Sequence, residues 1–388
     1  MIKTHKIKLY PNATMRRVLQ NLFNYRRYCY NEALEVWHEM YDESKLMMDK
    51  SLRPNERKVR DELVRNKQDW QFDLSARVLQ LTVHDLALGW KNFFDPQMPN
   101  HAQPHFKSKK SAKKTFRTDR ATIVMGKLRL DKPRTLKSWY DIKLAERPRW
   151  SGTLKMATVV EEPDGYYVSL SIEVDVPITA KTGSTVTGVD ANISRFDYKS
   201  DNGYRSVATM NNRLLVLYSR ITKYQRLLAR KRKVNPTNFR SNNYRSTRIK
   251  LQRDYQKVTR IQADILHKFT AQLTIDNDVV AIEDLDNLHM RMNKHLAKNL
   301  HRSLFGRFKQ IMQYKCAWHG VQLVMVDRFY PSTQRCSQCG YIKTGDDRVG
   351  LDGNRKHHTS HDEYVCYKCG AKMYRDQNAV ENLIQYVV

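Results

Sequence analysis

Hydrophobic and polar positions recur with different periods along the chain, and the changes of period divide it into segments. Residues 6–9 alternate Lys-Ile-Lys-Leu, which is typical of a half-buried strand, and Pro11 ends the run. Apolar side chains then recur at helical spacing over residues 12–41, with arginines on the other face, and a second helical stretch covers 54–94. The pattern therefore predicts one strand followed by a mainly helical segment.

A change of pattern follows the prolines at positions 96, 99 and 104. Short strand-like runs come next, at 123–125, 127–130, 153–160 and 166–176, and predict a β-rich module. From residue 185 onward, strands and helices are mixed. The predicted strands are one that ends at 190, one at 195–198, one after the turn at 201–203, and two more at 279–282 and 321–326. The predicted helices cover 213–273, with a break near Pro236, 303–318 and 376–384. This second half is predicted to be an α/β domain.

Composition and charge narrow the class of protein. The chain has 388 residues, 69 Lys plus Arg against 40 Asp plus Glu, a net charge of +29 and a pI near 9.8. This length allows two or three domains, and the excess of positive charge favours a polyanionic partner, namely nucleic acid. No run approaches the ~18 apolar residues of a membrane span, and the N-terminus lacks the apolar centre of a signal peptide. These features argue against a membrane-spanning, secreted or disordered protein.

Two Cys-x-x-Cys pairs predict a metal site. Each pair is followed by glycine, and a tetrahedron of four thiolates is the usual structural zinc site. Three histidines in the intervening loop could replace a cysteine as ligand, and the pairs could instead serve redox chemistry or have arisen by chance. The cysteines are Cys336, Cys339, Cys366 and Cys369, and the histidines are His357, His358 and His361. A closed four-thiolate shell would stabilise the fold without taking part in catalysis.

Three carboxylates stand at the ends of predicted elements. Asp190 and Glu283 follow apolar strands, and Asp376 opens the last helix. Hard oxygen ligands of this kind suit Mg²⁺ or Mn²⁺, and two such ions can act together on a phosphodiester. Each acid could instead be a helix cap or a surface residue, and Asp284 and Asp286 are nearby alternatives. From spacing alone, the carboxylate site is a hypothesis.

Basic residues predict where nucleic acid binds. Between residues 213 and 260 the chain holds fifteen Lys or Arg and one acid, Asp254. Short charge runs usually form a solvated helix face, but such a long one-sided run favours phosphate contact. A second basic run follows residue 106. The candidate nucleic-acid contacts are Lys107, Lys109, Lys110, Arg226, Arg230 and Lys231.

Five motifs in order resemble a known family. They are Gly188-Val-Asp190-Ala-Asn, Ala281-Ile-Glu283-Asp-Leu, Tyr330-Pro-Ser-Thr-Gln-Arg-Cys336-Ser-Gln-Cys339-Gly, Cys366-Tyr-Lys-Cys369-Gly and Arg375-Asp376-Gln-Asn-Ala-Val-Glu-Asn. The series is similar to the TnpB (OrfB) family of insertion-sequence-encoded RNA-guided DNA endonucleases, which are related to compact type V CRISPR effectors. Two places depart from the family pattern: the first motif continues Ala-Asn-Ile-Ser, and Tyr374 precedes Arg375-Asp376 where many members have aspartate.

The resemblance implies a multidomain α+β fold. Its parts would be a RuvC-like (RNase H-like) α/β nuclease core with an inserted zinc ribbon, a helical recognition module and a β-barrel-like wedge module. The implied boundaries are a wedge strand at 1–10, the helical recognition domain at 11–103, the wedge at 104–184, the core at 185–330, the zinc ribbon at 331–370 and the last core helix at 371–388.

The resemblance also implies an activity, RNA-guided hydrolysis of DNA. Asp190, Glu283 and Asp376 would hold Mg²⁺ or Mn²⁺ as the catalytic carboxylates, while the four cysteines would hold structural Zn²⁺. The expected partners are a guide RNA and double-stranded target DNA, without a membrane, for a monomer carrying one RNA. The expected location is the cytoplasm of a prokaryote, at the nucleoid. Two alternatives remain open: a nuclease-inactive RNA-guided repressor, and a transposase accessory protein that acts without RNA.

Overall fold

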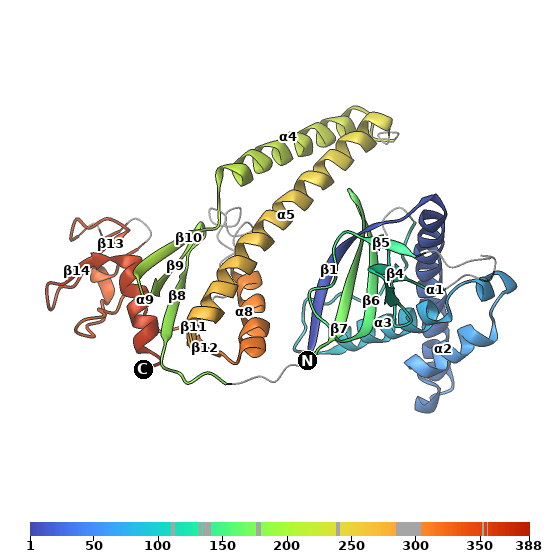
Figure 1. Ribbon diagram of the computed structural model, residues 1–388, viewed down its shortest axis with the longest axis horizontal. Coiled ribbons are helices and arrows are strands. Elements are labelled where there is room, and N and C mark those ends of the chain that lie inside the picture. Colours follow the sequence, from blue (N-terminus) through green and yellow to red (C-terminus); the bar gives the residue numbers. More distant parts are fainter. Residues whose placement is uncertain are drawn as a thin grey trace. The chain divides into compact units, whose positions relative to one another are not determined.

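The computed structural model describes the chain except residues 110–112, 132–133, 135–140, 176–179, 238–240, 285–303, 351–352 and 355. It divides into two compact units, Met1–Val176 and Pro177–Val388 (Figure 1). Among the described helices, none combines the length and the apolar character needed to cross a membrane.

The first unit contains a seven-stranded antiparallel sheet in the order β2-β6-β7-β1-β5-β4-β3. The N-terminal strand β1 lies inside this sheet, with β7 on one side and β5 on the other. The first strand of the chain therefore belongs to the β-rich segment that follows the helices. The strands are β1 (Ile2–Tyr10), β2 (Thr115–Thr118), β3 (Thr122–Val124), β4 (Lys127–Arg129), β5 (Ile142–Leu144), β6 (Thr153–Glu162) and β7 (Gly165–Glu173).

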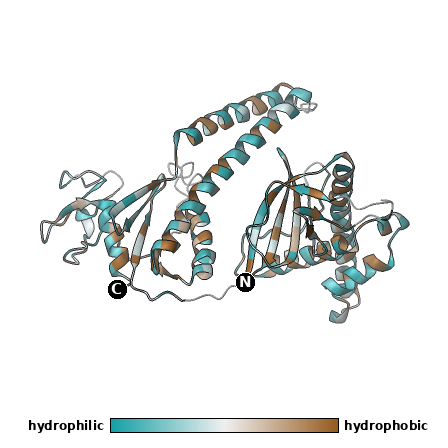
Figure 2. Cartoon of the chain, viewed as in Figure 1, coloured by the Kyte–Doolittle hydropathy of each residue, from teal (hydrophilic) through white to brown (hydrophobic). Residues whose placement is uncertain are grey.

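Three α-helices follow β1: α1 (Ala13–Leu46), α2 (Glu56–Arg65) and α3 (Ala76–Phe94). Hydrophobic residues recur in bands along α1 and pack with those of α3 and the sheet in one core (Figure 2). The single helix predicted over 54–94 is two helices, because the chain breaks at 66–75. A short 3₁₀ turn, η2 (Asp69–Asp73), fills the break, and a second, η1 (Lys50–Leu52), precedes α2.

The second unit contains a five-stranded sheet in the order β10-β9-β8-β11-β12. The first three strands are antiparallel, whereas β11 runs parallel to both β8 and β12. The strands are β8 (Val186–Ala191), β9 (Arg195–Ser200), β10 (Gly203–Ala208), β11 (Val279–Glu283) and β12 (Gln322–Val326). Phe196 of β9 stacks on Phe269 and Phe308, whose ring centroids lie 5.4 and 4.6 Å away, and these rings anchor the core beside the sheet.

Four helices complete the described part of this unit: α4 (Asn212–Val234), α5 (Asn242–Asp276), α8 (Phe305–His319) and α9 (Arg375–Gln385). The break predicted near Pro236 separates α4 from α5, which pack along one another as a helical hairpin (Figure 1). The cysteine segment precedes α9 and has little regular structure: η3 (Gly345–Asp347), β13 (Glu363–Val365) and β14 (Lys372–Tyr374). Figure 2 shows that this segment is mostly hydrophilic.

Gly188 allows α9 to pack directly on β8. A Cβ atom built at this position would lie 2.7 Å from both the Cβ of Leu383 and the carbonyl oxygen of Val380. Real Cβ atoms do not approach so closely, so only glycine fits at this crossing. The contact brings the start of α9, and with it Asp376, to the strand that carries Asp190.

Candidate metal centres and nucleic-acid surface

The fold brings the predicted carboxylates from three distant segments to one part of the second unit. Asp190 lies in β8, and Glu283 ends the neighbouring parallel strand β11, in which Ile282 pairs with Val189. Asp376 lies in the first turn of α9. Ligand oxygens of Asp190 and Asp376 lie within 4.8 Å of each other, and the charge of Glu283 also acts on Asp190.

Burial makes this cluster of acids electrostatically unfavourable without a cation. Asp190 is 5% exposed and Asp376 8% exposed. Burial, together with the negative charges of Glu283, Asp376 and Asp197, raises the pKa of Asp190 well above its ordinary value. Burial also raises the pKa of Glu283. A hydrogen bond from Ser332 Oγ acts in the opposite direction, but its effect is smaller. A bound divalent cation would reverse this destabilisation, because it neutralises the charge that the carboxylates share.

The neighbouring acids behave differently. Asp284 forms ion pairs with Lys309 and Arg328, at 2.5 and 3.6 Å. Glu283 instead acts on Asp190 through its charge, although it lies outside the group of carboxylate oxygens that are within 4.8 Å of one another. Asp286, the other alternative, lies outside the described residues.

Three polar residues of this site were missed from the sequence. Asp197 of β9 pairs directly opposite Asp190, and the Nδ2 atom of Asn192 donates to both carboxylates, at 3.1 and 3.2 Å. Arg195 donates to Asp197 and to Asp376. Asp197 and Arg195 are two apart on an alternating strand, Arg-Phe-Asp-Tyr-Lys, which indicates that they share a face. The register that sets Asp197 against Asp190 is a property of the folded sheet.

The carboxylate cluster fits a divalent cation on two counts. Its donors are all hard oxygens, which Mg²⁺ and Mn²⁺ prefer. In addition, the Oδ1 atom of Asp376 is buried without a hydrogen-bond partner among the described residues. Arg375 Nε lies 3.7 Å from this oxygen, beyond hydrogen-bond reach.

The four predicted cysteines also come together, with their sulfurs all within 4.8 Å of one another. The Sγ atoms of Cys336 and Cys369 are 3.8 Å apart, and those of Cys339 and Cys366 are 3.5 Å apart. A tetrahedron with zinc–sulfur bonds of about 2.3 Å separates its sulfurs by roughly 3.8 Å, whereas a disulfide brings them to about 2.0 Å. The spacing therefore fits a structural zinc ion.

Both cysteine pairs form the same tight turn. The Cys336 and Cys366 carbonyls accept hydrogen bonds from the backbone N–H groups of Gly340 and Gly370, respectively. Each glycine has a φ of +73°, which side chains disfavour, and this explains the glycine after each pair. Among the described residues, the group of sulfurs includes no histidine nitrogen; His357 instead contacts Asp347.

The cysteine segment is attached to α9 by side-chain amides. Asn378 accepts a hydrogen bond from the backbone N–H of Ser337 and donates to the carbonyl of Arg335, at 2.9 and 2.7 Å. Asn382 donates to the carbonyls of Ser332 and Arg335, at 2.8 and 2.7 Å. Because Ser332 Oγ also donates to Glu283, one short loop connects the thiolate centre, α9 and the carboxylate site.

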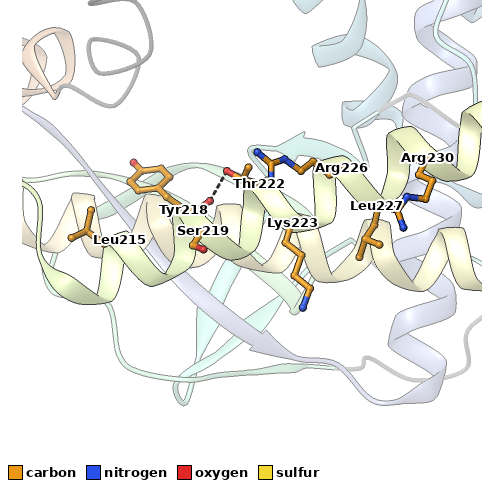
Figure 3. Close-up of a pocket in the computed structure, with 8 residues that line it drawn as sticks. All are labelled: Leu215, Tyr218, Ser219, Thr222, Lys223, Arg226, Leu227 and Arg230. Atoms are coloured by element: carbon orange, nitrogen blue, oxygen red, sulfur yellow. Dashed lines mark hydrogen bonds between the residues drawn. The ribbon is translucent and has the colours of Figure 1, made fainter.

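The predicted basic contacts fall into two groups. On α4, Arg226 and Arg230 are exposed and line a groove along the helix with Lys223 and Ser219 (Figure 3). Lys231 points elsewhere, because its Nζ donates to the Asn243 carbonyl and the Thr247 hydroxyl of α5, at 2.9 and 3.0 Å.

In the first unit, Lys107 is half buried against α1, where its backbone exchanges hydrogen bonds with Asn31 and its ammonium lies over the Tyr30 ring. Lys109 is exposed. Lys110 lies outside the described residues.

Taken together, the fold and the two centres define a mixed α/β protein with a carboxylate site suited to divalent cations and a four-cysteine site suited to zinc. Comparison with known proteins adds what the chain is similar to. Three family models match the chain: "Helix-turn-helix domain" of the OrfB type at residues 1–45, "Probable transposase" at 169–294, and "Cas12f1-like, TNB domain" at 305–383. The chain is therefore similar to proteins of the TnpB (OrfB) family, by three models that each match less than half of it.

Individual proteins are similar to the chain over most of its length. A Streptomyces pristinaespiralis protein named "Putative RNA-guided DNA endonuclease" is 27% identical over 390 residues, which cover 98% of this chain and 88% of the relative. An Escherichia coli K12 protein of the same designation, InsQ, is 26% identical, and the match covers 70% of this chain and 67% of InsQ. A Cas12f1 chain solved by cryo-EM with sgRNA and target DNA shares the fold, with a TM-score of 0.55 at 12% identity, over 99% of this chain and 98% of its own.

Proposed function

We propose that this chain is an RNA-guided DNA endonuclease encoded by a transposable element. Its RuvC-like core would comprise residues 185–330 and 371–388, with the cysteine segment as an inserted zinc ribbon. The observation that carries the proposal is that oxygens of Asp190 and Asp376, from separate segments, lie within 4.8 Å of each other, while the charge of Glu283 from a third segment acts on Asp190. The relatives' designations point to the same activity.

The carboxylates would hold two divalent cations, Mg²⁺ or Mn²⁺, which when bound activate a water molecule and stabilise the leaving oxygen of a phosphodiester. The protein's own groups prepare the site for this chemistry. The strand pairing of β8 with β11 fixes Asp190 beside Glu283, Ser332 orients Glu283, and the packing of α9 on Gly188 positions Asp376. These contacts would hold the three side chains in place before a cation binds, which is the preorganisation that electrostatic catalysis needs.

Base pairing with a guide RNA would supply sequence specificity, while basic side chains hold the nucleic-acid backbones. The α4 groove with Arg226 and Arg230 is one such surface, and the exposed Lys109 is a candidate in the first unit. The first unit would hold the wedge sheet and the recognition helices.

The test is a guide-dependent cleavage assay beside a DNA-binding assay, using the protein purified with its RNA. Asp190→Asn and Glu283→Gln should abolish cutting in Mg²⁺ and leave binding in Ca²⁺ intact, because docking depends on base pairing and basic residues. Asp264→Asn is the matched control, since Asp264 is exposed on α5 and forms an ion pair with Lys268 of the same helix. Wild-type binding without cutting would favour a repressor, and the absence of a copurifying RNA would favour an accessory protein that acts without one.

A further inference from the structure

Asp197 lies beside two of the proposed metal-binding carboxylates, Asp190 and Asp376. It stands directly opposite Asp190 in the antiparallel pair of β8 and β9, so both side chains project from the same face of the sheet. Ligand oxygens of Asp190, Asp197 and Asp376 all lie within 4.8 Å of one another. Glu283 reaches Asp190 from the other neighbouring strand, β11. Asp190 is therefore flanked by a carboxylate on each side.

A second observation points to a ligand at this group. Asp376 is more than nine-tenths buried, yet its Oδ1 atom has no hydrogen-bond partner in the described part of the chain. A buried carboxylate oxygen without a partner is costly, and a cation would satisfy it. Asp197 and Asp376 also line the same cavity, of about 300 Å³, together with Arg195 and Arg205, whose guanidinium groups suit a phosphate. The cavity therefore opens onto the side chains of Asp197 and Asp376.

Arg195 supplies the positive charge that these carboxylates require in the cation-free protein. Its guanidinium donates to Asp197 through Nε, at 3.0 Å, and to Asp376 through Nη2. Its side chain is about half exposed, so it can leave the carboxylates without disturbing the core. A divalent cation at these oxygens would compete with Arg195 for the same partners.

We propose that Asp197 is a fourth metal-binding carboxylate, which forms with Asp190 and Asp376 one of the two cation sites and leaves Asp190 and Glu283 to form the other. Arg195 occupies the first site until a cation displaces it. This inference rests on the proposed nuclease function, but it makes a separate statement about cation binding that can be tested without cutting.

The experiment measures Mn²⁺ binding to the full-length protein–RNA complex by the loss of the free-ion signal in electron paramagnetic resonance. Asp197→Asn keeps the size of the side chain and removes its charge. We expect it to weaken Mn²⁺ binding by about tenfold, because affinity for hard cations follows the number of charged oxygen ligands. The Mn²⁺ concentration for half-maximal cutting should rise by the same factor, with cutting recovered at saturation. Asp264→Asn should bind Mn²⁺ like the wild type.

Arg195→Gln separates ligation from an indirect effect. If Asp197 is a ligand and Arg195 a competitor, the two variants shift Mn²⁺ affinity in opposite directions: weaker for Asp197→Asn and tighter for Arg195→Gln. If Asp197 only holds Arg195, both variants bind Mn²⁺ equally well or more tightly than the wild type, and the proposal is overturned. Thermal unfolding in chelator confirms that each variant is folded.

The proposed function fails independently. A complex that binds Mn²⁺ in an Asp197-dependent way but never cuts guide-matched DNA would refute the nuclease and leave the cation site standing. If the wild-type complex cuts guide-matched DNA but Asp197→Asn binds Mn²⁺ with wild-type affinity, the proposed cation site is refuted and the nuclease function stands.

Discussion

Replacing Gly188 with alanine tests whether the packing of α9 on β8 sets the geometry of the carboxylate site. The added Cβ would lie 2.7 Å from Leu383 Cβ, 2.7 Å from the Val380 carbonyl oxygen and 3.3 Å from the Ile384 nitrogen. All three atoms belong to the backbone or are fixed to it, so no side-chain rotation relieves the clash. Carbon atoms normally pack at about 3.5–4.0 Å, so α9 must withdraw by roughly 1 Å.

The withdrawal should affect stability and cutting together. Overpacking a well-packed interior typically costs about 1–3 kcal/mol, and we expect the free energy of unfolding to fall by that amount. Asp376 moves with α9, and a displacement of about 1 Å in a catalytic group can cost roughly 100-fold in rate. Guide-dependent DNA binding in Ca²⁺ should change little, because the basic α4 groove is distant in sequence from α9 and does not depend on this crossing.

The assay combines thermal unfolding with single-turnover cutting by the protein–RNA complex. Gly89→Ala is the matched control: Gly89 lies in α3, its added Cβ would meet Pro104 Cγ at an ordinary 3.5 Å, and alanine favours helix over glycine by about 0.5–1 kcal/mol. It should therefore stabilise the protein slightly and leave cutting unchanged. If Gly188→Ala unfolded and cut like the wild type, the close packing of α9 would not determine the site.

Three further predictions concern other parts of the chain. Cys369→Ser should lower the zinc content found by metal analysis and loosen the cysteine segment, and a zinc-free wild type would contradict it. Replacing Arg226 or Arg230 with Gln should reduce the slope of log affinity against log salt by about 0.7–0.9 each, whereas Lys231→Gln, which faces α5, should leave the slope unchanged. Lys315→Met should raise the melting temperature at pH 7, because burial lowers the pKa of Lys315 to about 8; a gain that does not shrink between pH 8 and 10.5 would refute this.

The sign of the Lys315 effect follows from proton linkage. The pKa of Lys315 in the folded protein lies below its ordinary 10.5, so the folded state binds fewer protons than the unfolded state between pH 8 and 10.5. The stability of the wild type therefore rises with pH across this window. Below pH 8 the folded protein holds a buried ammonium whose one hydrogen bond, from Nζ to the His267 carbonyl at 2.6 Å, does not offset its desolvation, and methionine removes this charge while filling a similar volume.

Sequence alone predicted those parts of the sites that depend on local spacing. Each Cys-x-x-Cys-Gly unit forms its turn by itself, so the thiolate ligands could be named without knowing the fold. Asp190 and Glu283 could be named because each ends an apolar strand, although only the parallel pairing of β8 and β11 places them side by side.

Contacts between segments distant in sequence could not be predicted in the same way. Asp197 acquires its place from strand register, and a shift of one residue would turn it to the other face of the sheet. Lys231 looked like Arg226 and Arg230 in a basic run, but the packing of α4 on α5 decides which of them faces outward. The helix predicted over 54–94 failed for a local reason, because the capping residues Asn66 and Gln68 interrupt an apolar pattern that continues on both sides.

The position of the thiolate centre in the chain has a structural reason. In the chain it lies between β12, which pairs with the strand that ends in Glu283, and α9, which carries Asp376. The segment that holds it contacts both Glu283 and α9. Ser332 donates to Glu283, while Asn378 and Asn382 tie the first cysteine turn to α9. A zinc ion that fixes this turn would therefore also fix the distance between the second and third carboxylates. Loss of zinc should therefore slow cutting, because Glu283 would no longer be held in position, even though the thiolate shell takes no part in the chemistry.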